Sequence, residues 1–243
     1  MAIARGTTPQ GTATEAEASG WVRQMFGAIA PRYDLLNHLL SFNLDRGWRR
    51  RTVDRLRPIL ERPESRVLDL CCGTGDLTLE LARGGCAQVW GSDFCHPMLQ
   101  RASEKGVPRL FEGDALRLPV ADSSFDLITA AFGFRNFANY RDGLVELLRV
   151  LRPGGTLAIL EFSTPPNALV RLGYAFYSSR ILPFLGGLIS GSRSAYEYLP
   201  ESVRKFPGAE DLAQEMRSLG YETVHFERLT LGIVALHIGI KRG

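Results

Sequence analysis

The sequence predicts an α/β protein with a mainly parallel, seven-stranded sheet, helices on both faces and a C-terminal antiparallel hairpin. Three observations lead to this prediction. Apolar strand patterns alternate with amphipathic helix patterns between residues 66 and 163. A glycine turn follows the first of these strands, in 67-VLDLCCGTGDLT-78. The last two strands are joined only by a short turn at Gly232, which makes them antiparallel.

The composition is that of an ordinary globular chain. The 243 residues are 45% hydrophobic and 23% charged, and the net charge of +3 is too small to indicate nucleic acid binding. The four cysteines show no CxxC spacing, so neither a metal site nor a disulfide framework is predicted. We therefore expect reduced thiols in a cytoplasmic protein.

The N-terminal part of the chain has two predicted segments. Residues 1–19 are rich in Ala, Thr, Gly and Glu, which predicts a disordered tail, and they lack the apolar core of a signal peptide. Residues 20–60 are predicted to be helical, with Trp48 and Leu56 on the buried face. Exposed or lipid-facing positions on this helix are expected for Arg49, Arg50, Arg51, Arg55 and Arg57.

The remaining elements follow in order after Pro63. The predicted strands span residues 66–70, 88–94, 109–114, 125–132, 156–163, 221–230 and 233–241. The predicted helices span residues 75–84, 97–105, 139–151 and 209–220, the last capped by Gly220. An apolar, aromatic segment at 165–207 interrupts the alternation of strands and helices.

Acidic residues end three successive strands, at the sheet edge where open α/β sheets bind ligands. Asp93 can accept from both hydroxyls of a ribose, and Asp114 can receive an adenine amino group. Thr78 replaces the third glycine of a dinucleotide fingerprint, so an adenosine ligand with an amino-acid tail is favoured. The predicted cofactor-binding residues are Asp69, Gly73, Thr74, Gly75, Asp93, Asp114, Ala115 and Phe132.

This combination resembles the class I methyltransferases, which implies S-adenosylmethionine as the cofactor. A narrower resemblance covers residues 21 to 241, to the menaquinone/ubiquinone biosynthesis C-methyltransferase family. It is carried by 33-YDLLNHLLSFNLDRGWR-49, GFRN at 133–136, 149-RVLRPGGTLAILEFS-163, SAYEYLPESV and ALHIGIK. The chain departs from the family pattern at Leu36, Asn43, Asp45 and Ala131.

The resemblance implies methylation of a ring carbon of a prenylated quinol, with demethylmenaquinol converted to menaquinol. The benzoquinol of the ubiquinone pathway, another lipid-like acceptor and a catalytically inactive partner protein are the alternatives. A single domain over 20–243 is expected, with a helical lid at 20–60 and a helical insertion on the acceptor side at 165–207. Residues 172–191 are a candidate for contact with the prenyl tail or the inner face of the cell membrane, and a homodimer is also expected.

The stretch 131-AFGFRNF-137 is the predicted catalytic segment. Ionisation of a quinol hydroxyl makes the neighbouring ring carbon nucleophilic, and a phenol ionises only near pH ~10. Arg135 can stabilise the oxyanion, and Asn136 can orient a water or the hydroxyl. Tyr33 and Asn37, four residues apart on one helical face, are predicted to line the acceptor pocket with Tyr196.

Overall fold

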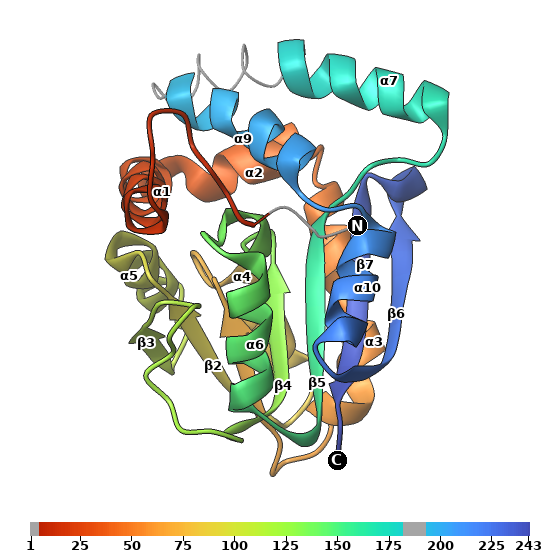
Figure 1. Cartoon of the computed structure of the whole chain (residues 1–243). Coiled ribbons are helices and arrows are strands. Elements are labelled where there is room, and N and C mark those ends of the chain that lie inside the picture. The colour runs from red at the N-terminus through yellow and green to blue at the C-terminus, as the bar shows by residue number, and fades with distance from the viewer. Residues whose placement is uncertain (1–4, 182–192) are drawn as a thin grey trace.

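The predicted α/β architecture is confirmed by a computed structural model, which describes residues 5–181 and 193–243 (Figure 1). In these residues seven strands form one sheet in the order β3-β2-β1-β4-β5-β7-β6. The parallel strands are β1 (Arg66–Leu70), β2 (Gln88–Asp93), β3 (Leu110–Glu112), β4 (Phe125–Ala131) and β5 (Leu151–Phe162). The C-terminal hairpin is formed by β6 (Tyr221–Leu229) and β7 (Val234–Lys241), and β7 runs antiparallel to both β5 and β6.

Helices cover both faces of the sheet, so its strands are buried on both sides. One face packs against α6 (Tyr140–Val150) and α10 (Ala209–Ser218), the other against α3 (Leu44–Leu60) and α4 (Asp76–Arg83). Alternation along β1 matches this arrangement: Leu68 and Leu70 join the first cluster, and Val67 joins the second. Helix α5 (His96–Glu104) packs beside β2 and β3.

Helices from two distant parts of the chain lie over the carboxyl edge of the parallel strands (Figure 1). The N-terminal part supplies α1 (Glu15–Ile29), η1 (Ala30–Arg32) and α2 (Tyr33–Leu40). The segment after β5 supplies α7 (Ala168–Phe176), η3 (Tyr177–Ile181) and α9 (Arg193–Lys205). A separate apolar cluster holds α1, α2, α5 and α9 together, and it contains Val22, Met25, Leu40, Met98 and Tyr198. The remaining short helical turns are η2 (Phe134–Asn136) and η4 (Thr230–Gly232).

The N-terminal tail differs from the expectation of disorder over residues 1–19. Helix α1 already begins at Glu15, because Thr14 and Glu17 form a reciprocal capping box. Upstream of it, the Thr7 amide donates to the Phe137 carbonyl over 2.8 Å. The T-x-x-E pattern at 14–17 was the available signal for the helix start, whereas the long-range contact of Thr7 had no sequence signal.

None of the helices in the described ranges combines the length and apolar character that a membrane span requires.

Candidate active site

The predicted residues converge at the carboxyl ends of β1, β2 and β4. Two adjoining pockets there, which we call together the glycine-turn pocket, share Tyr33, Cys71, Gly73 and Phe132. The predicted cofactor residues that line them are Asp69, Gly73, Thr74, Asp93, Asp114, Ala115 and Phe132. Gly75 does not line either pocket, and a Cβ added there would meet Val107 and Ala102 instead.

The turn between β1 and α4 presents its backbone to the pocket. Gly73 and Gly75 both have left-handed backbone conformations, with φ of 54° and 85°. The Gly73 amide donates to Asp93 Oδ2 over 2.9 Å, and the Cys95 amide donates to Asp93 Oδ1 over 2.9 Å. Burial raises the pKa of Asp93 to about 6 despite these donors. A carboxylate has about four acceptor positions, so Asp93 retains capacity for ligand hydroxyls.

Asp69 links the helix after the glycine turn to the neighbouring strand β4. Its side chain is buried, and its two oxygens accept from the hydroxyls of Thr78, over 2.6 Å, and Thr129, over 2.7 Å. Burial raises the pKa of Asp69 to about 6. With both oxygens engaged by protein donors, Asp69 mainly fixes the start of α4 against β4.

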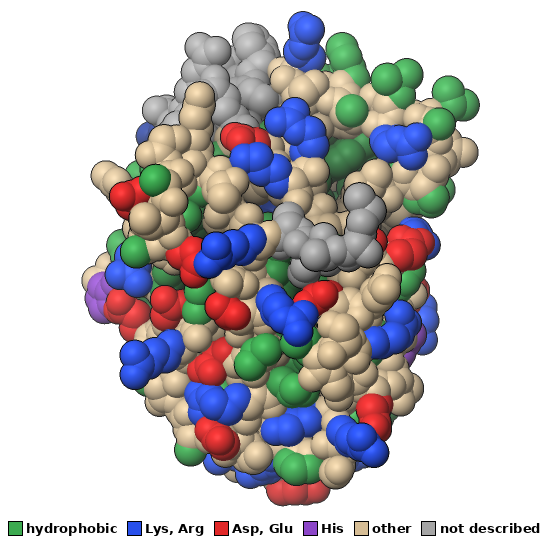
Figure 2. Space-filling model, viewed as in Figure 1, with side chains coloured by type: hydrophobic (Ala, Val, Ile, Leu, Met, Phe, Trp, Pro, Cys, Tyr) green, Lys and Arg blue, Asp and Glu red, His purple; other side chains and the backbone are tan. Residues whose placement is uncertain are grey.

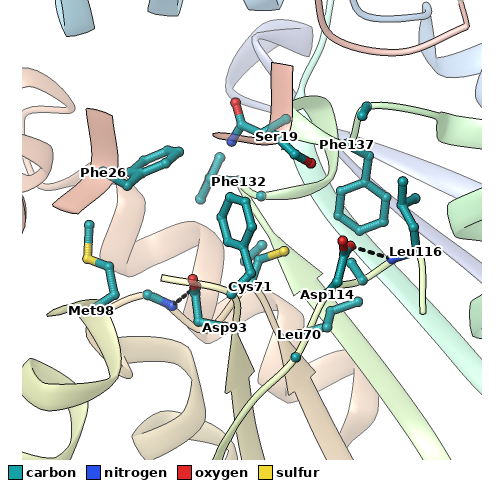
Figure 3. A pocket seen from close by; sticks show the side chains of 18 of the residues that line it. Ser19, Phe26, Leu70, Cys71, Asp93, Met98, Asp114, Leu116, Phe132 and Phe137 are labelled. Atoms are coloured by element: carbon teal, nitrogen blue, oxygen red, sulfur yellow. Dashed lines mark hydrogen bonds between the residues drawn. The ribbon is translucent and has the colours of Figure 1, made fainter. Parts of the chain in front are cut away.

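The far end of the glycine-turn pocket is formed by Asp114, Ala115 and helix α1. Asp114 Oδ1 accepts from the Leu116 amide over 2.9 Å, which fixes the carboxylate at the pocket wall (Figure 3). Ser19 and Phe26 of α1 lie across the pocket from the strand ends (Figure 3). No local sequence pattern indicates that α1 folds over the sheet edge, so neither residue was a predicted site residue.

Thr74 connects the turn to the helices above it. Its hydroxyl donates to Asp34 Oδ1 over 2.5 Å, and Lys105 Nζ donates to Thr74 Oγ1 over 3.0 Å. Lys105 also pairs with Asp34 and with Asp76, at 2.5 and 2.6 Å. This network joins α2, the turn, α4 and the end of α5. Cofactor binding by Thr74 stays a prediction. In the structure its hydroxyl contacts Asp34 and Lys105.

A larger cavity, which we call the aromatic cavity, opens beside the glycine-turn pocket. It has a volume of about 410 Å³ and includes the predicted residues Tyr33, Asn37 and Arg135 in its lining. Its aromatic lining residues are Tyr33, Phe42, Trp48, Phe132, Phe162, Tyr174 and Tyr177. Tyr196, the third predicted substrate residue, belongs to α9, but its side chain lies outside the described part of the chain.

Four residues lie between the glycine-turn pocket and the aromatic cavity, since each lines both spaces: Tyr33, Asn37, Arg49 and Phe132. Phe132 has a left-handed backbone with φ of 56°. Its ring lies 5.0 Å from that of Phe162 and 5.8 Å from that of Trp48, between ring centroids. Packing between aromatic neighbours therefore holds an unfavourable backbone conformation at the junction of the two spaces.

Arg135 is held in a buried ion pair at the wall of the aromatic cavity. Its Nη1 lies 3.0 Å from Oε1 of Glu161, which is 1% exposed, and it also donates to the Phe132 carbonyl. Burial lowers the pKa of Arg135, but the charge of Glu161, its hydrogen bond and the nearby tyrosines Tyr33 and Tyr198 together raise it by more, so the guanidinium stays protonated. Nε of Arg135 is buried and has no hydrogen-bond partner among the described residues. Glu161 was not a predicted site residue, although it lies in the quoted EFS stretch.

Asn136 points to the other space. It lines the glycine-turn pocket rather than the aromatic cavity, and its Oδ1 accepts from the Tyr198 hydroxyl over 3.0 Å. The structure therefore separates the two predicted catalytic side chains, and only Arg135 faces the predicted acceptor space.

Arg49 was expected on the exposed face of its helix, and the structure contradicts this. Its side chain is buried and lines both the glycine-turn pocket and the aromatic cavity. Nη2 pairs with Asp45 at 2.7 Å and with Asp76 at 3.3 Å. The helix face that includes Arg49 is covered by α4, a tertiary contact that helical periodicity alone does not indicate. Of the other arginines, Arg51 and Arg55 pair with Glu227 on β6.

Comparison with known proteins decides the family. The profile of the ubiE/COQ5 methyltransferase family matches residues 12–241. The chain belongs to this family. It is therefore a methyltransferase that uses S-adenosylmethionine, as the sequence analysis predicts.

Family relatives are similar over nearly their whole length. A demethylmenaquinone methyltransferase of Thermus thermophilus is 53% identical over 88% of this chain and 99% of its own. One of Deinococcus radiodurans is 48% identical, over 91% of this chain and 92% of its own. A ubiquinone/menaquinone biosynthesis C-methyltransferase of Geotalea daltonii is 41% identical, over 90% of this chain and 96% of its own.

Solved structures support the fold assignment of this family member. An S-adenosylmethionine-dependent methyltransferase of Thermotoga maritima is 18% identical, with a TM-score of 0.65 over 90% of this chain and 99% of its own. The [4+2]-cyclase SpnF is 19% identical, with a TM-score of 0.67 over 97% of this chain and 99% of its own. Since the second protein is named for a different reaction, the shared fold alone does not define the chemistry.

The residues of the glycine-turn pocket fit the family's cofactor. Asp93 is a buried acceptor with free capacity at the end of the second strand, which suits ribose hydroxyls. An added Cβ at Gly73 would meet only the Tyr33 ring, at 3.7 Å, so space remains beside the turn. Asp114 and Ala115 line the pocket at its other end, where an adenine can be placed.

Proposed function

We propose that this methyltransferase transfers the methyl group of S-adenosylmethionine to a ring carbon of demethylmenaquinol, giving menaquinol. The observation that carries the proposal is the aromatic cavity, which holds a protonated arginine and meets the glycine-turn pocket at Phe132 and Tyr33. Its flat, aromatic walls suit a bicyclic ring, and its open end suits an apolar tail. The names of the relatives from Thermus and Deinococcus support the same acceptor.

A benzoquinol of ubiquinone biosynthesis is the second candidate acceptor. The relative from Geotalea is named for both quinone pathways, so the family includes members assigned to both rings.

The side chains of the cavity have separate roles in this reaction. When bound, S-adenosylmethionine supplies a methyl group already activated by its sulfonium. Arg135 stabilises the negative charge that develops on the quinol oxygen, since a guanidinium does not release its proton. Burial raises the pKa of Tyr33, so its hydroxyl stays protonated and can donate to the same oxygen. Glu161 keeps Arg135 in place but is too buried to reach the acceptor.

We propose further that α1 to α3 form the lid of the site and that α7, η3 and α9 form its acceptor side. Reversible contact with the membrane surface accompanies this role, because a prenylated acceptor resides there. A homodimer stays a prediction, which light scattering of the purified chain can test.

The acceptor is tested with purified chain, labelled S-adenosylmethionine and reduced short-chain quinols. We expect label on the ring of the naphthoquinol, with a kcat/KM well above that for the benzoquinol. A preference for the benzoquinol would replace the proposed acceptor by the second candidate, and label on neither ring would contradict both.

An experiment on the role of Arg135 must also consider Glu161, its buried ion-pair partner. Arg135→Ala leaves the buried Glu161 carboxylate without its partner, which costs roughly 3–5 kcal/mol of stability. The double variant Arg135→Met, Glu161→Gln removes both charges, so we expect it to recover most of the melting temperature. We expect both variants to lose most turnover and to bind S-adenosylmethionine nearly normally in calorimetry. Near-normal turnover of the double variant, or loss of its cofactor binding, would contradict the role.

A further inference from the structure

Residues 5–8, which we call the N-terminal strap, cross the loop that follows η2. The Thr7 amide donates to the Phe137 carbonyl, and the Tyr140 amide donates to the Arg5 carbonyl, both over 2.8 Å. A Cβ added at Gly6 would lie 1.9 Å from the Ala138 carbonyl oxygen, so the two backbones are in direct contact. The strap precedes residues 12–241, the part that the family profile matches.

Thr7 begins a chain of side-chain hydrogen bonds that ends in the glycine-turn pocket. Thr7 is 4% exposed, and its hydroxyl oxygen lies 2.7 Å from the Tyr198 hydroxyl. Tyr198 donates its single hydroxyl proton to Asn136 Oδ1 over 3.0 Å, so Thr7 must be the donor to Tyr198. The hydrogen bonds therefore run from Thr7 of the strap, as the first donor, through Tyr198 to Asn136 of the pocket wall.

The strap also holds the two helices on either side of this wall. Arg5 pairs with Glu15 of α1 at 2.9 Å, and Lys205 of α9 donates to the Thr8 carbonyl over 3.0 Å. The Tyr198 ring of α9 lies 5.0 Å from the Trp21 ring of α1. Helix α1 supplies Ser19 and Phe26 to the pocket. The strap therefore contacts α1, α9 and the loop after η2, the three segments on this side of the pocket.

We propose that the N-terminal strap positions the outer wall of the cofactor pocket, and that Thr7 is the positioning residue that fixes Asn136 through Tyr198. The inference rests on the glycine-turn pocket being the S-adenosylmethionine site. The hydrogen-bond chain ends on the cofactor side of η2, whereas the side chain of Arg135 on the acceptor side is held by Glu161. Loss of the strap contact therefore weakens cofactor binding and leaves the acceptor side intact.

Thr7→Val in the full chain tests this directly, since it keeps the shape of the side chain and removes the hydroxyl. We expect Kd for S-adenosylmethionine, measured by calorimetry, to rise about fivefold, as for the loss of one buried hydrogen bond. The cofactor KM rises by the same factor, while kcat and the acceptor KM change little. Thr7→Ser retains the hydroxyl and should bind normally. Thr223→Val is the matched control, because the Thr223 side chain is exposed on β6, outside the strap and both pockets.

Gly6→Ala provides a second, independent variant. The added methyl group must push the strap off Ala138 without changing the hydroxyl, so we expect at least the same loss of affinity. Adding Thr7→Val to Gly6→Ala should then have little further effect. Unchanged Kd in Thr7→Val would overturn the inference, as would an equal loss of cofactor and acceptor affinity. If the unchanged chain fails to bind S-adenosylmethionine, the assignment of the pocket is wrong instead.

Discussion

At the scale of single residues, Arg135 and Asn136 are neighbours in sequence that serve different spaces. They belong to the η2 turn, where successive side chains point about 120° apart because a 3₁₀-helix has three residues per turn. Glu161 holds the first residue at the aromatic cavity, and Tyr198 holds the second at the glycine-turn pocket. In the proposed reaction, the arginine places its charge beside the acceptor, and the next residue, Asn136, faces the proposed cofactor pocket.

We predict that Asp93 makes cofactor binding depend on pH. Burial raises its pKa to about 6 in the free protein, and hydroxyl donors of the ligand favour the ionised carboxylate. Affinity is therefore full above pH 6 and falls as pH drops through this value, approaching tenfold per pH unit for one proton. Calorimetry between pH 5 and 7.5 measures this. Asp93→Asn should bind weakly with a flatter profile.

The same pKa shift acts on folding in the opposite sense. Asp69 and Asp93 both bind protons more tightly in the folded chain than in the unfolded chain, so their contribution to stability falls as pH rises from about 4 to about 6. The free chain therefore gains stability from these groups in the pH range where cofactor affinity is lost.

For the binding prediction, cofactor affinity that stays constant down to pH 5 would exclude Asp93 as the ribose acceptor.

At the scale of elements, the β1–α4 turn combines two glycines with different tasks. Both have positive φ, but their surroundings differ. A Cβ at Gly75 would lie 2.5 Å from Cγ2 of Val107, where α4 and α5 meet, whereas a Cβ at Gly73 would face only Tyr33 at 3.7 Å. Gly75 therefore serves helix packing, and Gly73 serves the pocket.

Alanine substitutions separate these tasks. Gly75→Ala adds a clash to the backbone strain, so we expect a loss of roughly 2–4 kcal/mol in the free energy of unfolding. Gly73→Ala adds only the strain of about 1 kcal/mol, but its methyl group enters the cofactor's space and should weaken binding. Urea unfolding and cofactor calorimetry on both variants give the comparison. Equal losses of stability in the two variants would show that the surroundings do not distinguish them.

At the scale of the whole molecule, the helices that supply the lining of the aromatic cavity also carry exposed apolar side chains. The exposed large hydrophobic side chains on α2, the start of α3, α7 and η3 are Leu35, Leu39, Phe42, Leu44, Leu169, Leu172, Phe176 and Ile181. Figure 2 shows hydrophobic side chains gathered over α7, with Lys or Arg side chains beside them. An apolar patch with flanking cations fits an anionic membrane surface, the place from which a prenylated acceptor would enter.

If the exposed apolar side chains of α7 contact the membrane, replacing them with serine should weaken vesicle binding. In flotation with vesicles that contain anionic lipid, we expect the chain to be enriched in the vesicle fraction. Leu169→Ser, Leu172→Ser and Phe176→Ser together should abolish the enrichment, because each removes an apolar side chain from the bilayer interface. Val145→Ser on α6 is the matched control, since Val145 is also exposed but lies on a different helix. Absence of enrichment for the unchanged chain would contradict the membrane contact.

The sequence by itself determined the sheet, the alternation of its elements and the acids at the strand ends. These features follow from local periodicity and from the rule that parallel strands place their carboxyl ends at one edge. It also determined the family, because the quoted motifs are contiguous in the chain. Asp69, Asp93 and Asp114 were identified in this way, and they line the two adjoining parts of the glycine-turn pocket, Asp69 in one part and Asp93 and Asp114 in the other.

Only the tertiary structure decided which side chains meet. Thr7 reaches Tyr198 across 191 residues, Arg135 pairs with Glu161, and Arg49 is buried although its helix pattern favoured exposure. Composition predicted a disordered tail because residues 1–19 carry little apolar surface, but the strap is held by hydrogen bonds to a distant loop. Such contacts depend on where elements pack, and periodicity within one element carries no information about its partners.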